Sequence, residues 1–139
     1  MALEINLRRL KTYAPLVLRI GMAAVFLYFG ITQLMRPEAF VGWLPPEANL
    51  IPLPATTLVA LNGGFETLFG TLLLLGLFRR ISALLLGMHL MMITITIGLT
   101  DIGVRDFGLA VAAISIALTE TDNLSLDTFF SDRESDMVI

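Results

Sequence analysis

Four long apolar segments dominate the pattern of hydrophobic and polar positions along the chain. They cover residues 13–35, 53–78, 81–99 and 102–119. A helix needs about 20 apolar residues to cross a bilayer, and the first three segments have that length. The fourth is continuously apolar only over residues 107–118, about 18 Å of helix at a rise of about 1.5 Å per residue. To span, it must begin near Ile102 and carry Arg105 and Asp106 into the outer membrane edge.

Polar positions between these segments predict an antiparallel bundle. The arginine pair at 79–80 is a short polar turn, which makes the second and third helices neighbours. Thr100 is a candidate N-cap for the fourth helix. The connection over residues 36–52 is longer and contains prolines that prevent a continuous helix. Within it, a short helix is expected over residues 38–44, with Trp43 in the headgroup region.

The predicted fold class is therefore all-α. It is a polytopic membrane protein, an antiparallel four-transmembrane-helix bundle with a longer outer loop between helices 1 and 2. A single transmembrane domain is expected over residues 1–120, and the part before Tyr13 is predicted to form an interfacial helix. Residues 121–139 are expected to form a polar, acidic and partly mobile tail. The acidic residues of this tail are Asp122, Asp127, Asp132, Glu134 and Asp136.

The distribution of Lys and Arg predicts the orientation, because these residues gather in short cytoplasmic loops. One side of the predicted bundle carries Arg8, Arg9, Lys11, Arg79, Arg80 and Arg133, and the other carries Arg36 and Arg105. This asymmetry predicts a multi-pass protein of the cell membrane with both termini in the cytoplasm.

Composition agrees with a membrane protein and excludes several classes. The chain is 56% hydrophobic and 15% charged, against about 45–50% and about 25% in soluble domains. With no Cys and one His, it cannot build a thiolate metal site, an iron–sulfur cluster or a bis-histidine haem site by itself, so no metal is predicted. The formal net charge of −3 is too small to indicate nucleic acid or another strongly charged partner. The expected partner is the lipid bilayer.

Each predicted helix carries one stripe of small or polar residues, and the four stripes facing inward predict a bundle with a polar interior. The stripes are Arg19, Ala23, Phe26, Gly30 and Gln33; Asn62, Gly63, Glu66 and Gly70; Ser82, His89 and Thr96; and Gly108, Ala112 and Ser115 on the side of Arg105. The bulky face of the fourth helix is predicted to contact lipid, or a partner helix in a homo-oligomer. That face consists of Phe107, Val111, Ile114 and Leu118.

Glu66 and His89 are the leading candidates for chemistry. Glu66 lies about 18–20 Å from the outer end of its helix and His89 about 12 Å from the inner end of the next, so both are near the midplane. A carboxylate at this depth costs about 2.5–3.5 kcal/mol on insertion scales. Glu66 is a candidate to exchange protons or to hold a quinol hydroxyl or a cationic group; the alternative is a structural pair. His89 is a candidate proton relay or quinone ligand, or an interhelical hydrogen-bond partner. We expect the two side chains to point into the bundle and to interact.

Other polar residues are predicted around this centre. Asn62 and Gln33 belong to the outer half of the bundle, as does Arg105. Two positions of Arg105 remain open: a surface pair with Asp101, or an inward position near Glu66 and Asn62.

Two further charges are expected to be structural. Asp106 suits the positive N-terminal end of a helix. Arg105 and Asp106 are adjacent, so they project about 100° apart and are not expected to face each other. Arg19 is expected to snorkel to the cytoplasmic headgroups.

Several motifs, in this order and spacing, resemble those of the DoxX-like family of small membrane proteins. They are Arg19-Ile20-Gly21, Phe29-Gly30-Ile31, Pro37, Trp43, Gly64-Phe65-Glu66, Gly70, Gly76-Leu77-Phe78-Arg79-Arg80, Met88-His89-Leu90 and Val104-Arg105-Asp106-Phe107-Gly108-Leu109. The resemblance covers residues 19–118 and implies four transmembrane helices in one domain. Gln33 stands where the family usually has a Lys after its first glycine motif.

The resemblance implies several kinds of function. Some relatives are membrane subunits of quinone-linked sulfur oxidoreductases, others associate with thiol or oxidative-stress enzymes, and distant eukaryotic relatives are receptors or chaperones. We therefore expect an accessory, non-catalytic membrane subunit of a quinone-linked or redox-associated system, with a quinone as the candidate cofactor. The alternative is a non-enzymatic protein that docks another membrane protein through the loop around Trp43 or the acidic tail. A small transporter is a third alternative, and it would have to be an oligomer.

Overall fold

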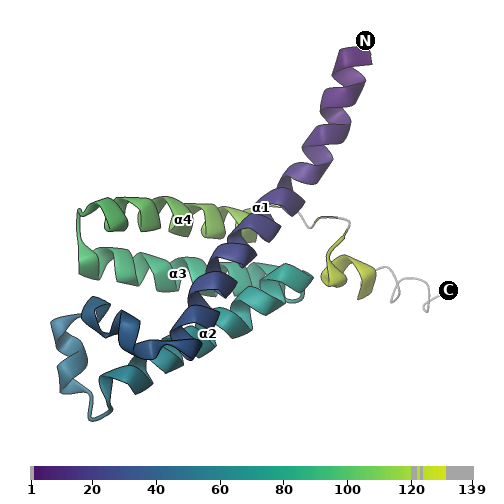
Figure 1. Ribbon diagram of the computed structural model, residues 1–139. Coiled ribbons are helices and arrows are strands. Elements are labelled where there is room, and N and C mark those ends of the chain that lie inside the picture. Colours follow the sequence, from purple (N-terminus) through teal and green to yellow (C-terminus); the bar gives the residue numbers. More distant parts are fainter. Residues whose placement is uncertain (1, 120–121, 123, 131–139) are drawn as a thin grey trace.

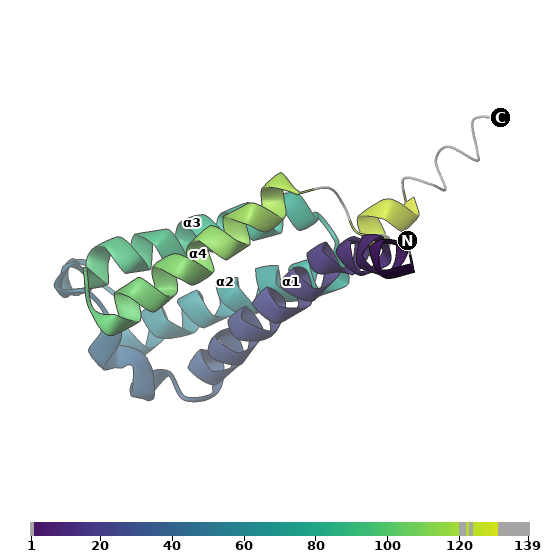
Figure 2. The same ribbon diagram turned by 90° about the horizontal axis from the view of Figure 1, so that it is seen from above.

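The computed structural model describes residues 2–119, 122 and 124–130, and for residues 2–10 it describes the backbone alone. The α-helices are α1 (Ala2–Met35), α2 (Ala55–Leu75), α3 (Arg79–Ile97) and α4 (Asp101–Leu118). Two 3₁₀ helices, η1 (Pro37–Trp43) and η2 (Pro46–Leu50), lie between α1 and α2. The α1–α2 and α3–α4 hairpins pack side by side (Figures 1 and 2). The predicted all-α bundle is confirmed.

The two ends of the bundle differ. The described parts nearest the two termini lie at one end, which we call the termini end, and η1 and η2 lie at the opposite loop end (Figure 1). The short helix expected over residues 38–44 is present as η1, and η2 follows it. The segment before Tyr13, predicted as an interfacial helix, is helical and continuous with the rest of α1, which projects beyond the other helices.

Three helices of the described chain are long and apolar enough to cross a membrane. They are Lys11–Met35 of α1, Ala55–Leu75 and Arg79–Ile97. The fourth helix, α4, has 18 residues and begins with the charged part of the sequence. It packs closely on α3, and its N-terminus is capped as predicted, because the Thr100 hydroxyl accepts a hydrogen bond of 3.1 Å from Gly103 N. The structure therefore shows three apolar helices with a fourth packed against them.

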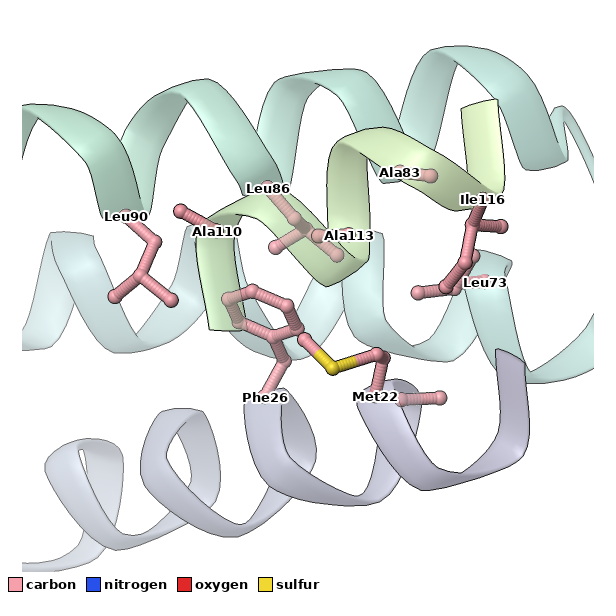
Figure 3. Close-up of a cluster of buried hydrophobic side chains, with 10 residues drawn as sticks. Met22, Phe26, Leu73, Ala83, Leu86, Leu90, Ala110, Ala113 and Ile116 are labelled. Carbon is pink, nitrogen blue, oxygen red and sulfur yellow. The ribbon is translucent and has the colours of Figure 1, made fainter. Parts of the chain in front are cut away.

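The core is built from a few large side chains and several alanines. It consists of Met22, Ala23, Phe26, Leu73, Ala83, Leu86, Leu90, Ala110, Ala113 and Ile116, and Figure 3 shows this cluster. Ala83 belongs to α3, and Ala110 and Ala113 belong to α4, which packs against it. Small side chains allow close helix packing in a membrane, where there is no water to expel between apolar surfaces.

The predicted inward stripes agree with burial on α1 and α2. All five stripe residues of α1 are buried, and so are Gly63, Glu66 and Gly70 on α2. The inner face predicted for α4 is wrong, because Gly108 is exposed and Ala112 and Ser115 are only half-buried. The buried residues of α4 are Gly103, Asp106, Ala110, Ala113 and Ile116.

The outer face of α4 follows the prediction in part. Phe107, Val111 and Leu118 are exposed, whereas Ile114 is half-buried. A Cβ added to Gly87 of α3 would lie 2.7 Å from Ile114 Cγ1. Ile114 is therefore turned toward α3, because the missing side chain at Gly87 leaves room for it.

Arg19 does not snorkel; it is 2% exposed. Its Nε donates to Asp122 Oδ2 over 2.9 Å and its Nη2 to Asp122 Oδ1 over 3.2 Å. Its Nη1 donates to the carbonyl oxygens of Leu73, over 3.0 Å, and of Leu74. These carbonyls are among the last of α2, where a helix leaves acceptors for groups outside it. The expectation for Arg19 was wrong because a counter-ion and a helix end lie within its reach.

Charged side chains also cap the next two helices at the termini end. Arg79 is fully buried, and it donates to the carbonyl oxygens of Ile116 over 2.7 Å and Thr119 over 2.6 Å, at the end of α4. Asp127 accepts hydrogen bonds of 2.9 Å from the backbone N–H groups of Phe78 and Arg79, at the start of α3. Residues 122 and 127 of the expected mobile tail are thus bound to the bundle, whereas its acidic residues Asp132, Glu134 and Asp136 lie outside the described residues.

Candidate functional site

A ring of hydrogen bonds surrounds the Glu66 carboxylate at the middle of α2. Gln33 Nε2, from α1, donates to Glu66 Oε2 over 3.2 Å. Asn62 Nδ2 donates to Glu66 Oε1 over 3.1 Å and to Gln33 Oε1 over 2.7 Å. Glu66 and Gln33 are both buried. A carboxylate in apolar surroundings needs such donors, and each of its oxygens retains a lone pair for a further donor.

Two glycines bring the donors to Glu66. A Cβ on Gly63 would lie 2.7 Å from Gly30 O and 2.8 Å from Gln33 Cβ, and one on Gly30 would lie 2.7 Å from the backbone N of Thr67. Because neither position has a side chain, α1 and α2 approach closely enough for Gln33 to reach Glu66. Asn62 reaches it from one turn earlier on the same helix.

His89 brings α3 into the same cluster. Its Nε2 lies 3.6 Å from Glu66 Oε1, and its ring packs on that of Phe65 with centroids 4.8 Å apart. The 3.6 Å between His89 Nε2 and Glu66 Oε1 is too long for a hydrogen bond. The buried Nε2 has no hydrogen-bond partner among the described residues. The expected proximity of Glu66 and His89 inside the bundle is confirmed.

The cluster lies at the wall of a cavity of about 570 Å³. The cavity extends toward the loop end, where it is bordered by η1 and the ends of α3 and α4. Most of its lining is apolar or aromatic, including Phe29, Trp43 and Met92. Cavities of about 300–1,000 Å³ with an apolar lining and a few polar groups are typical of small-molecule sites.

Arg105 and Asp106 form a second polar group in this cavity. Arg105 Nε lies 2.9 Å and Nη2 2.8 Å from Asp106 Oδ1, so the expectation that the two do not face each other is wrong. Adjacent residues of a helix project about 100° apart only where their side chains leave the backbone. The Arg105 side chain is long enough to fold back and bring its guanidinium to the Asp106 carboxylate. Arg105 also lies 5.9 Å from the Phe29 ring centroid, a cation–π contact.

Neither position expected for Arg105 describes the structure fully. Asp101 is exposed, and Arg105 pairs with Asp106 in its place. Arg105 lines the cavity together with Glu66 and Asn62, but its described hydrogen bonds do not reach them, and its side chain is 54% exposed.

Asp106 is the site residue that sequence reasoning missed. The sequence assigned it to the helix N-terminus, but the structure buries it on the cavity wall. One signal was available, because Asp106 shares a helical face with the small residues Gly103 and Ala110. Within the described part of the chain, no group of three or more acidic or histidine side chains is arranged to hold a metal ion.

The site therefore combines groups from all four helices: Gln33 from α1, Asn62 and Glu66 from α2, His89 from α3, and Arg105 and Asp106 from α4. Chemically, such a site can hold an oxygen-bearing small molecule against apolar walls. It can also pass a proton between a carboxylate and an imidazole.

Comparison with curated proteins and with solved structures finds no significant match. The DoxX family matches residues 14–99, well over half of the 139-residue chain. The matched region includes Gln33, Asn62, Glu66 and His89, whereas Arg105 and Asp106 lie beyond it. The chain is a multi-pass membrane protein that belongs to the DoxX family.

Proposed function

We propose that this chain is an accessory, non-catalytic membrane subunit that binds a quinone or quinol in the cavity and exchanges protons with it through Glu66 and His89. The observation that carries the proposal is the position of the Glu66 cluster on the wall of an apolar cavity of about 570 Å³. A ligand of this site must dissolve in lipid and must also carry an oxygen that can hydrogen-bond. Quinones and quinols combine both properties.

The polar groups give each form of the ligand a partner. A quinol hydroxyl can donate to Glu66, whose oxygens have spare lone pairs. A quinone carbonyl needs an N–H donor, and the imidazole of His89 supplies one when it is protonated on the side facing the cavity. Since the chain has no Cys and one His, a bound quinone or a partner protein supplies any redox chemistry.

Purification from native membranes in a mild detergent, followed by organic extraction, tests this function. The proposal predicts quinone at close to one molecule per chain, and loss of that quinone from a variant that fills the cavity, Val59→Trp. Val59 is buried and lines the cavity. A protein that co-purifies without any quinone would support the alternative, a non-enzymatic docking partner.

We also propose that both termini are cytoplasmic. The chain has no Cys, so single cysteines can be introduced without background labelling. Arg80→Cys in the first turn of α3 and Ala48→Cys in η2 lie at opposite ends of the bundle. In intact cells, an impermeant maleimide should label residue 48 and spare residue 80; the reverse pattern would invert the orientation.

A further inference from the structure

The cavity contains a second carboxylate that the proton exchange described above does not use. Asp106 is buried on α4, whereas Glu66 is on α2 in the other hairpin, and both line the cavity. Both contacts from Arg105 fall on Oδ1 of Asp106. Among the described residues no hydrogen bond uses Oδ2. Asp106 lines the cavity and its Oδ2 has lone pairs that no described contact uses, so Oδ2 is an acceptor available to a ligand.

Each of these carboxylates has a nitrogen-bearing side chain beside it that can act as a hydrogen-bond donor. His89 Nε2 lies 3.6 Å from Glu66 Oε1, and Arg105 Nη2 lies 2.8 Å from Asp106 Oδ1. Arg105 has five N–H donors, and its described contacts occupy only Nε and Nη2. Both polar groups therefore offer an acceptor for a hydroxyl and a donor for a carbonyl oxygen.

The rest of the cavity lining is mostly apolar and aromatic. Phe26, Phe29 and Leu109 belong to it, and Phe29 lies under the guanidinium of Arg105. Such a surface suits the face of a flat ring. A ring with oxygen on one side only would contact just one of these two polar groups.

We infer that the ligand is a ring with oxygen on two opposite sides, held by Glu66 and His89 at one side and by Asp106 and Arg105 at the other. This inference rests on the proposed function and narrows it to para-dioxygenated rings in both redox states. In the reduced form the two hydroxyls donate to Glu66 and Asp106. In the oxidised form the two carbonyl oxygens accept from His89 and Arg105.

A displacement assay on the full-length protein in lipid nanodiscs tests the two-sided contact. Trp43, the single Trp of the chain, lines the cavity, and bound 2-decyl-1,4-benzoquinone should quench its fluorescence. The competitors are 2-decylhydroquinone, with two hydroxyls, and 4-decylphenol, with one. Wild-type protein should bind the hydroquinone about tenfold more tightly than the phenol, the value of one hydrogen bond to a charged group.

Variants then separate the two sides. Asp106→Leu should weaken the affinity for the hydroquinone about tenfold. The affinity for the phenol should not change, because the phenol can still bind at Glu66. Asp101→Leu, at an exposed acid on the same helix, should change neither competitor. The Arg105 side chain is about half exposed, so Arg105→Gln should still fold. This variant should weaken binding of the benzoquinone more than binding of the hydroquinone.

The outcomes distinguish this inference from the function it rests on. Equal affinities of wild-type protein for hydroquinone and phenol, or an equal loss of both in Asp106→Leu, would overturn the two-sided site and leave quinone binding intact. Failure of wild-type protein to bind any of the three probes would overturn the proposed function, and the inference with it. If Asp106→Leu does not fold, a benzoquinone affinity unaffected by Arg105→Gln overturns the inference.

Discussion

Replacing Asp122 with alanine should lower the free energy of unfolding by about 3–5 kcal/mol, the usual effect of removing one partner of a buried ion pair. Arg19 and Asp122 are both about 2% exposed in this pair. Without Asp122, the guanidinium of Arg19 keeps its hydrogen bonds to carbonyl oxygens at the end of α2 but loses its counter-ion. The loss can be measured by reversible unfolding in detergent, followed by circular dichroism.

Two controls define the origin of this effect. Glu47→Ala removes an exposed carboxylate in η2 and should leave stability within about 0.5 kcal/mol of wild type. Combining Arg19→Met with Asp122→Leu should recover part of the loss, because replacing a whole buried pair is cheaper than breaking it. Equal stability of the Asp122→Ala and Glu47→Ala variants would show that the Arg19–Asp122 ion pair contributes nothing to stability.

Alanine at Gly63 should destabilise the bundle by about 1–3 kcal/mol, the range for overpacking, whereas alanine at the adjacent Gly64 should not. A Cβ at Gly63 meets the backbone of α1 at 2.7 Å, which can yield only if the helices separate. A Cβ at Gly64 has nothing within 4 Å, and alanine is favoured over glycine within a helix by about 1 kcal/mol. Gly63→Ala and Gly64→Ala therefore compare the same substitution at neighbouring residues, of which only Gly63 lies against α1.

Gly63→Ala should also weaken quinone binding, because Gln33 can no longer lie against α2 and reach Glu66. Unfolding in detergent gives the stability, and quenching of Trp43 gives the binding. Gly30→Ala should reproduce both effects from the other helix, since its Cβ would meet Thr67 N at 2.7 Å. If Gly63→Ala and Gly64→Ala behave alike, close contact of α1 and α2 does not position this site.

Periodicity was enough to predict the centre of the bundle. On α1, residues spaced by three and four positions are buried together, from Arg19 to Gln33. Counting residues from the helix ends predicted Glu66 and His89 at the same depth, because the rise of about 1.5 Å per residue is regular along both helices. Both features follow from the regular geometry of a single helix, which can be predicted from the spacing of residues in the sequence.

The remaining features depend on contacts that are distant in sequence or on the shape of side chains. Asp122 is 103 positions from Arg19, and composition alone assigned it to a mobile tail. The rotation of α4 was mispredicted because polar or small residues occur on two of its faces, and packing of Ala110 and Ala113 on α3 selects one. The size of the cavity depends on how side chains from different helices pack, so the residue pattern along the chain does not predict it.

Displacement of 2-decyl-1,4-benzoquinone by 2-decylhydroquinone, followed by Trp43 fluorescence in wild type and in Glu66→Gln, tests the central claim most directly. Glutamine keeps the shape of Glu66 but not its charge or its titratable proton. We expect saturable quenching in both proteins, with about tenfold more hydroquinone needed for displacement in Glu66→Gln. Quenching that rises without saturation, or equal displacement in the two proteins, would contradict a quinone site at Glu66.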